Sequence, residues 1–97
     1  MQISEFQRLI ERLYFSRDSA RGLGGSFLWF MEEVGELATA LREGDEEELA
    51  GEFADVFAWL VTLASMKGID MEQAAAAKYA SGCPACRCAP CDCATKP

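Results

Sequence analysis

Four acidic residues have the spacing that a metal site between two helices requires. Glu33 and Glu36 are three residues apart, so they lie on one face if their segment is helical. Glu52 and Asp55 repeat this spacing further along the chain. Gly44 lies midway between the two pairs. Glu36 and Glu52 are each eight residues from it, and Glu33 and Asp55 are each eleven residues from it. An antiparallel hairpin that turns at Gly44 would therefore place the two pairs at matching heights, given a rise of about 1.5 Å per residue.

Four converging carboxylates would repel one another strongly without a cation between them. Two unit charges about 4 Å apart repel by roughly 4 kcal/mol at an effective dielectric constant of about 20. Divalent ions such as Mg²⁺ prefer oxygen ligands, and carboxylates offer them. If the two helix faces are turned toward each other, the spacing therefore predicts a site for a divalent metal ion such as Mg²⁺ at Glu33, Glu36, Glu52 and Asp55.

A solvated acidic face is the alternative interpretation of each acidic run. It suits the three glutamates at 46–48, which begin a predicted helix and complement its dipole. It also remains open for the glutamates on the other side of the turn, Glu32, Glu33 and Glu36. It suits Glu52 and Asp55 poorly, because the residues around them are apolar and an unpaired charge there is costly.

A second group of residues with metal-binding chemistry is a cysteine cluster near the C-terminus. All five cysteines lie between Cys83 and Cys93, as a CxxC pair followed by a CxC pair with Cys88 between them. Four thiolates suit a structural Zn²⁺ site, with these candidate ligands: Cys83, Cys86, Cys91 and Cys93. Reduced or redox-active thiols and an iron–sulfur cluster are the alternatives. Catalysis by the thiols is not expected, since the sequence has no histidine to activate them.

The elements that must position these residues are helices. Apolar residues recur at helical spacing, and no stretch alternates as a strand would. We expect an all-α chain with four helices, at residues 4–20, 27–42, 46–67 and 70–80. The glycine-rich stretch 21–25 separates the first two, with Ser26 as a cap, and Asp45 and Asp70 cap the last two. The short 42–46 connection favours an antiparallel hairpin.

Composition and charge narrow the class of protein. The 97 residues, 51% of them hydrophobic, suit one small globular domain whose core is completed by oligomerisation, as a homodimer or homotetramer. The net charge of −7 argues against a nucleic-acid polymer or an anionic membrane as partner. No signal peptide or segment of transmembrane length is evident, which predicts a cytoplasmic protein.

The composition changes after Gly82, where the cysteines begin. We expect residues 1–82 to form the all-α domain and residues 83–97 a cysteine-rich tail, a candidate zinc knuckle. A tail of this length is too short to fold alone, so a bound zinc ion would tether it.

Two acidic motifs stand sixteen residues apart, Glu32-Glu33-Val34-Gly35-Glu36 and Glu52-Phe53-Ala54-Asp55. Together they form an EExxE…ExxD pattern, by which the sequence resembles the MazG-like nucleotide pyrophosphohydrolases. The resemblance spans nearly the whole chain, because further stretches look like short members of this family. These stretches are Arg17-Asp18, Arg21-Gly22-Leu23, Phe27-Leu28-Trp29, Lys78-Tyr79, Gly82-Cys83-Pro84 and Pro90-Cys91.

The resemblance implies a four-helix MazG-like bundle and a specific reaction. Members of the family hydrolyse a nucleoside triphosphate between the α- and β-phosphates, with Mg²⁺ bridging the acidic cluster and the phosphates. A ribo- or deoxyribonucleoside triphosphate is thus the expected substrate, and housekeeping of the nucleotide pool the expected purpose. The catalytic ligands would be Glu33, Glu36, Glu52 and Asp55. Glu32 would bind a second ion or accept a proton from the attacking water.

Two further residues are candidate substrate contacts. Lys78 would contact a phosphate, although a solvated lysine is the plainer alternative. Trp29 precedes Glu33 by about one helical turn, so it could stack on a base, with core or dimer packing as the alternative. For Arg17 and Arg21 we expect surface roles.

Two other functions are compatible with the sequence. The first is a non-enzymatic, helical metal-binding interaction module whose acidic residues form a structural site. The second is a phosphohydrolase of the same fold that acts on another phosphorylated metabolite. Metal binding without turnover would favour the first, and a broad substrate panel would reveal the second.

Overall fold

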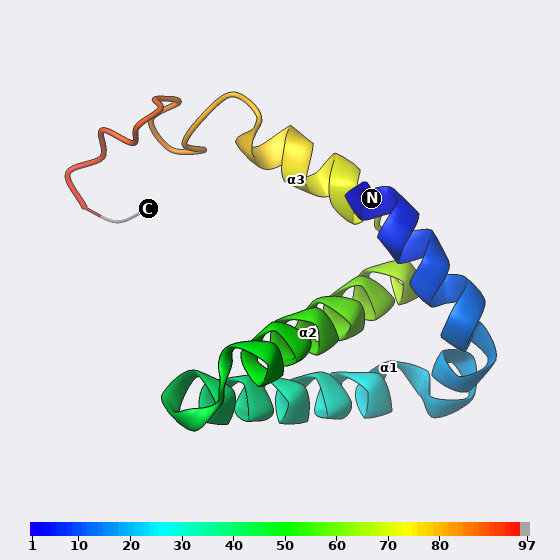
Figure 1. Ribbon diagram of the computed structural model, residues 1–97. Helices are drawn as coiled ribbons and strands as arrows, with labels where there is room; N and C mark the ends of the chain where they lie inside the picture. Colours follow the sequence, from blue (N-terminus) through cyan, green and yellow to red (C-terminus); the bar gives the residue numbers. More distant parts are fainter. Residues whose placement is uncertain (96–97) are drawn as a thin grey trace.

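Helices account for all the regular secondary structure in residues 1–95, the part of the chain that the structure describes. In this computed structural model, α1 spans Ile3–Glu43, α2 spans Glu46–Met66 and α3 spans Met71–Tyr79 (Figure 1). No strand occurs among the described residues, so the expected all-α fold class is confirmed. The final two residues of the predicted tail, Lys96 and Pro97, lie outside the described range.

The break expected between the first two helices is a kink at one residue, Gly22. Its φ of 81° and ψ of 171° lie in a region that is nearly reserved for glycine. The kink divides α1 into a first arm, residues 3–21, and a second arm, residues 23–43, which run in different directions (Figure 1). The helix resumes directly after the kink, so the break predicted in the glycine-rich stretch is confirmed, although it is confined to one residue.

The prediction that Ser26 caps the second arm is wrong. Because the second arm already begins at residue 23, Ser26 lies inside the helix. Its side chain is fully buried, and its hydroxyl accepts a hydrogen bond from Nη1 of Arg21 at 3.3 Å. Ser26 therefore links the two arms across the kink instead of starting a helix.

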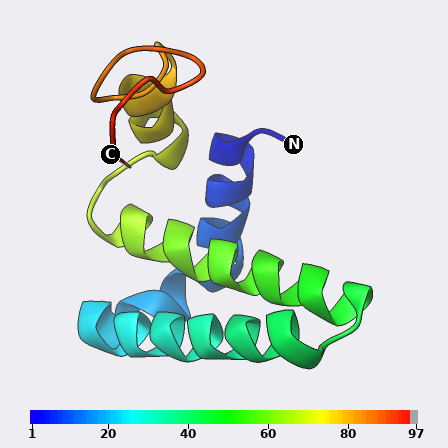
Figure 2. The same cartoon turned by 90° about the vertical axis from the view of Figure 1, so that its left-hand side faces the viewer.

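The turn between α1 and α2 has the predicted chemistry. The amide of Gly44 donates to the carbonyl of Ala40 at 2.8 Å, and the Asp45 carboxylate accepts from the amide of Glu48 at 2.8 Å. A Cβ atom added to Gly44 would lie 2.9 Å from the Ala40 carbonyl oxygen, so the tight turn requires glycine. The second arm and α2 consequently lie side by side as an antiparallel hairpin (Figures 1 and 2).

The core of the chain lies where the two arms of α1 meet α2. Among the described residues, the buried hydrophobic side chains are Ile10 from the first arm, Ala40 from the second and Val61 from α2. Phe6 stacks on Phe57 with ring centroids 5.0 Å apart, which adds apolar contact between the first arm and α2. The first arm is therefore held across the hairpin, opposite the end at which the turn lies.

A buried glutamine fixes the connection between α2 and α3. Gln7 of the first arm is fully buried, and its Nε2 donates to Ser65 Oγ at 2.9 Å and to the Ile69 carbonyl at 2.8 Å. Its Oε1 accepts from the amide of Met71 at 2.8 Å. Asp70 caps α3 as predicted, accepting from the amide of the third helical residue at 2.9 Å.

The C-terminal part of the chain extends away from the hairpin. None of the residues of α3 is buried, and residues 80–95 form turns and irregular structure (Figure 2). The division into a domain at 1–82 and a tail at 83–97 stays a prediction.

Within the described part of the chain, one helix, α2, is long and apolar enough to cross a membrane by its length and composition. The prediction that no segment reaches this length is therefore wrong. Helices in the core of soluble proteins meet the same criterion, and α2 packs along α1 while carrying Glu52 and Asp55. The prediction that the protein has no membrane partner remains a prediction.

Candidate active site

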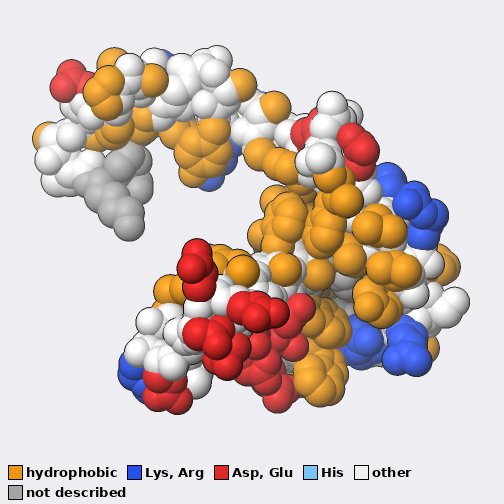
Figure 3. Space-filling model, viewed as in Figure 1, with side chains coloured by type: hydrophobic (Ala, Val, Ile, Leu, Met, Phe, Trp, Pro, Cys, Tyr) orange, Lys and Arg blue, Asp and Glu red, His pale blue; other side chains and the backbone are white. Residues whose placement is uncertain are grey.

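Three of the four predicted carboxylates meet on the hairpin formed by the second arm and α2. Oxygen atoms of Glu33, Glu36 and Glu52 all lie within 4.8 Å of one another. Asp55 is outside this group of three, yet its charge raises the pKa of both Glu33 and Glu52. Figure 3 shows acidic side chains gathered as one patch on this part of the molecule. The equal distances from Gly44 along the sequence thus correspond to neighbouring positions in space.

Two oxygen atoms of this acidic cluster are shielded from water without a hydrogen-bond partner. They are Oε2 of Glu33 and Oε2 of Glu52. Burial raises the pKa of Glu33 from 4.5 to about 7, with the charges of Glu36 and Asp55 as the next causes. Burial is also the main cause that raises the pKa of Glu52, again with contributions from Glu36 and Asp55. The site therefore resists full ionisation unless positive charge is added.

No basic side chain supplies that charge within residues 1–95. The arginines that form ion pairs there do so with acids outside the cluster: Glu11, Asp18, Glu43 and Asp70. A divalent cation is the partner that fits carboxylate oxygens left without a donor. The acidic cluster is thus suited to hold a metal ion.

A cavity of about 270 Å³ lies between the first arm and α2, and Asp55 belongs both to its wall and to the surroundings of the acidic cluster. Arg17 and Arg21 line the same cavity. Arg21 pairs with Asp18 at 2.9 Å, and its guanidinium lies over the ring of Trp59, 4.8 Å from the centroid. Arg21 is therefore held in place next to the cluster, which the expectation of a simple surface role did not foresee.

The spacing of four residues in the sequence is compatible with this cavity. Arg17 and Arg21 are four residues apart, and so are Asp55 and Trp59, so each pair shares one helix face. The direction in which Gly22 turns the first arm decides whether these faces meet. That direction depends on contacts of the first arm with α2, which no local pattern reveals.

Trp29 forms part of an aromatic pair beside the arginine. Its ring stacks on that of Trp59, with centroids 6.3 Å apart and planes inclined by 13°. Trp29 is 48% exposed, so it is not a core residue of the single chain. Its free surface is accessible both to a stacking base and to a second chain.

The other two predicted site residues lie outside the acidic cluster. Glu32 is exposed and does not belong to the group of three glutamates. Lys78 is exposed on α3, with its ammonium nitrogen 5.7 Å from the ring centroid of Tyr79. Figure 1 shows α3 extending away from the hairpin, so a single chain does not bring Lys78 to the carboxylates. Its role as a phosphate contact stays a prediction.

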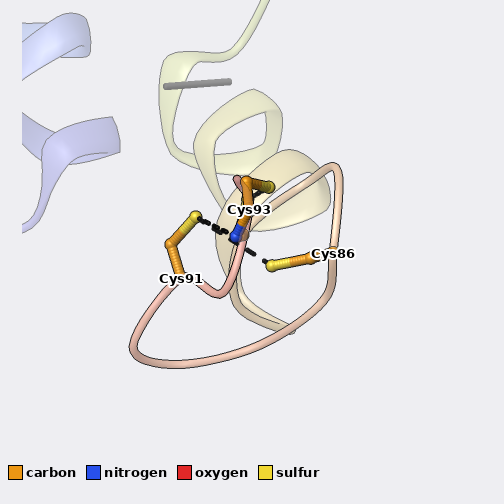
Figure 4. Close-up of side chains that lie close together, drawn as sticks. Cys86, Cys91 and Cys93 are labelled. Atoms are coloured by element: carbon orange, nitrogen blue, oxygen red, sulfur yellow. Dashed lines mark hydrogen bonds between the residues drawn. The ribbon is translucent and has the colours of Figure 1, made fainter. Parts of the chain in front are cut away.

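Four of the five cysteines meet in the tail. Sulfur atoms of Cys83, Cys86, Cys91 and Cys93 lie within 4.8 Å of one another, and all five cysteines are free thiols. Figure 4 shows Cys86, Cys91 and Cys93 around the loop, with the hydrogen bonds between them. A hydrogen bond from the amide of Asp92 is the main cause that lowers the pKa of Cys86 to about 6. The thiol of Cys91 is the main cause that raises the pKa of Cys93 to about 11.

A family model for the MazG nucleotide pyrophosphohydrolase domain matches residues 26–86, more than half of the chain. The chain belongs to the MazG family. This agrees with the resemblance in the acidic motifs and with the all-helical fold. A comparison with curated proteins found no matching sequence.

The MazG match covers nearly all of the hairpin and only part of the rest of the site. The acidic cluster, α2, α3 and the first two cysteines lie inside it. The first arm, with Arg17 and Arg21, lies before it, and Cys91 and Cys93 lie after it. MazG membership therefore supports a nucleotide pyrophosphohydrolase-like chemistry at the hairpin, whereas the cavity and the cysteine cluster are argued from geometry.

Proposed function

We propose that this chain is a Mg²⁺-dependent nucleoside triphosphate pyrophosphohydrolase, which releases a monophosphate and pyrophosphate. MazG family membership supports the class of reaction. The observation that carries the metal is the pair of buried carboxylate oxygens without a donor, on Glu33 and Glu52. Such oxygens would serve as ligands of a magnesium ion, which takes oxygen ligands from carboxylates and from substrate phosphates.

The acidic residues have separate tasks in this proposal. Glu33, Glu36 and Glu52 hold the metal, with Asp55 completing the set from the cavity side. Bound Mg²⁺ neutralises phosphate charge and lowers the pKa of a coordinated water. Glu32 is exposed beside the cluster, where it accepts a proton from the attacking water or binds a second ion.

The cavity beside Asp55 suits the remainder of a nucleotide. Arg17 and Arg21 line it, with Arg21 paired to Asp18 in the same wall, and an arginine matches phosphate geometry with paired donors. The half-exposed ring of Trp29 offers a stacking surface next to the same arginine and Trp59. A triphosphate bound across the cluster and the cavity would thus meet metal, cation and aromatic groups in turn.

The substitution Glu52→Gln tests the metal assignment. It keeps the shape of the side chain but removes a charge, so kcat for nucleoside triphosphate hydrolysis should fall at least about a hundredfold. The helical fold should persist, because one repelling charge is lost. The matched control is Glu47→Gln, which changes an exposed residue in the first turn of the same helix and should stay within about twofold of the wild type. Undiminished turnover in Glu52→Gln would refute the assignment.

The proposal extends to the assembly and its surroundings. The enzyme works as a homodimer or homotetramer in the cytoplasm, on free nucleotides and not on nucleic-acid polymers or membranes. The net charge of −7 supports the absence of a polyanionic partner. Cleansing or balancing of the nucleotide pool is the corresponding purpose.

A further inference from the structure

We propose that the tail of this chain is a closed zinc site formed by Cys83, Cys86, Cys91 and Cys93, with Cys88 excluded from it. This inference is independent of the hydrolase proposal, because it rests on different residues at the other end of the molecule. Its first basis is the mutual approach of four sulfur atoms to within 4.8 Å.

Two of the distances between the sulfur atoms are close to those expected around a single tetrahedral ion. With zinc–sulfur bonds of about 2.3 Å, the edges of a regular tetrahedron of sulfurs measure about 3.8 Å. The sulfurs of Cys83 and Cys93 are 3.8 Å apart, and those of Cys86 and Cys91 are 4.0 Å apart. Both distances are far longer than a disulfide bond, which measures about 2.05 Å. The four thiols are therefore arranged around one point, not joined in pairs.

Backbone amides support two of these sulfurs. The amide of Asp92 donates to Cys86 Sγ at 3.3 Å, and the amide of Cys93 donates to Cys91 Sγ at 3.4 Å. Such donors partly neutralise a thiolate and orient it, as the partners around metal ligands do. They are a second observation, separate from the clustering of the sulfurs, that indicates thiolates at these positions.

The loop around Cys83 is built as a tight knuckle. The amide of Cys83 donates to the Cys88 carbonyl at 3.0 Å, and the amide of Arg87 donates to the Cys83 carbonyl at 2.7 Å. Gly82 has a φ of 106°, and a Cβ atom there would lie 3.0 Å from the carbonyl oxygens of Arg87 and Cys88. Only glycine fits this position, so the backbone is shaped to turn the first cysteine pair toward the second.

Cys88 provides an internal control. Its sulfur donates to the Cys86 carbonyl at 3.4 Å, its side chain is exposed, and it is not part of the group of four. A cysteine at the middle of the same loop thus lies outside the site. The geometry therefore distinguishes four ligands from a fifth, chemically identical residue.

A metal also explains how so short a segment holds a defined shape. None of residues 83–95 is buried, and none of them is part of a helix or strand. Thirteen such residues cannot fold around an apolar core, whereas metal binding can order a segment of this size. Four cysteine sulfurs this close together suit Zn²⁺. A four-iron cluster would spread the sulfurs further apart, since each would bind a different iron atom.

A closed site of four protein ligands has a structural role. It leaves no position for water or substrate, so it contributes to folding and not to catalysis. Zinc with four thiolates carries two net negative charges, and Lys78 lines the same surface hollow as Cys83 and Cys91. Lys78 is therefore placed to complement the charge of the zinc site at the end of α3.

Metal analysis of the full-length chain tests this proposal. Protein purified in the presence of zinc and reductant should contain about one zinc per chain, measured by elemental mass spectrometry. Cys91→Ser should lower the zinc content at least about tenfold, and the matched control Cys88→Ser should leave it unchanged. Equal zinc content in the two variants, iron in place of zinc, or no bound metal in freshly reduced protein would each overturn the assignment.

Cobalt titration of the wild-type chain keeps the test independent of the folding of any variant. Co²⁺ in a tetrahedral site of four thiolates gives intense visible and charge-transfer absorption, which one equivalent of Zn²⁺ should remove. Saturation at one Co²⁺ per chain supports the site. Absence of these bands in reduced protein would contradict it. Neither readout depends on hydrolase activity, so this proposal and the proposed function can fail separately.

Discussion

At the scale of single residues, the ionisation of Glu33 reports most directly on the acidic cluster. Its pKa is raised to about 7, whereas the unfolded chain loses this proton near pH 4.5. The folded state therefore binds more protons between these two values, and the free energy of unfolding falls as pH rises through this interval. The sequence has no histidine, so no imidazole titrates in the same range.

Thermal unfolding of metal-free protein between pH 5 and pH 8 measures this effect. We predict that Tm of the wild type falls toward pH 8 relative to that of Glu33→Gln, which mimics the protonated side chain at every pH. The cysteine tail is the same in both proteins, so its contribution cancels in the difference. Added Mg²⁺ should raise the wild-type Tm most at pH 8. Parallel Tm profiles of the two metal-free proteins would contradict the burial of Glu33 described above.

Much of the acidic cluster was predictable from residue spacing, whereas the cavity was not. The equal distances of Glu36 and Glu52 from Gly44 place them at matching heights in an antiparallel hairpin that turns there. No comparable sequence spacing predicts the position of Arg21. Its position over Trp59 depends on how the first arm folds back across α2, which is decided by distant contacts such as those of Gln7.

At the scale of secondary-structure elements, the direction of the chain at Gly22 decides where the first arm lies. A Cβ atom at Gly22 would meet nothing within 4 Å, so the cost of substitution is purely conformational. We predict that Gly22→Ala lowers the free energy of unfolding by about 1–3 kcal/mol, because φ of 81° with ψ of 171° is strained for alanine.

The matched control is Gly51→Ala, in the interior of α2. The added Cβ atom again meets nothing within 4 Å, but the backbone is helical, so the change should stabilise the protein by about 0.5–1 kcal/mol. Chemical denaturation followed by circular dichroism measures both variants. Equal effects of the two substitutions would contradict the kinked conformation.

Helix caps and tight turns are determined by residues that are close together in the sequence. The caps Asp45 and Asp70 and the turn at Gly44 were predictable, because each depends on residues within four positions. The restart of the helix directly after Gly22 was not predictable, because serine is a favoured N-cap residue and Ser26 could therefore have begun the helix. Burial of Ser26 against Arg21 outweighs that local preference.

At the scale of the whole molecule, the single chain is too open for its length. Its radius of gyration is 15.8 Å, whereas a compact chain of this length has about 12.5 Å. Large apolar side chains, among them Leu28, Phe53 and Tyr79, are at least half exposed. Figure 3 shows hydrophobic side chains covering the middle of one face, between the acidic patch and α3. A second copy of the chain would cover surface of this kind.

We therefore predict that the protein sediments in solution at no less than twice its chain mass of 10.6 kDa. Analytical ultracentrifugation over a range of micromolar concentrations measures this directly. A stable monomer with unchanged helicity across that range would show that the exposed apolar surface is not an interface between copies.

The measurement that tests the central claim most directly is product analysis by phosphorus NMR. The eight common ribo- and deoxyribonucleoside triphosphates would each be incubated with the full-length protein, with Mg²⁺ and with chelator. We predict that at least one substrate gives equal amounts of monophosphate and pyrophosphate, only with Mg²⁺, and that Glu52→Gln abolishes this product. Diphosphate and orthophosphate instead, or no Mg²⁺-dependent product from any of the eight in folded protein, would contradict the proposed reaction.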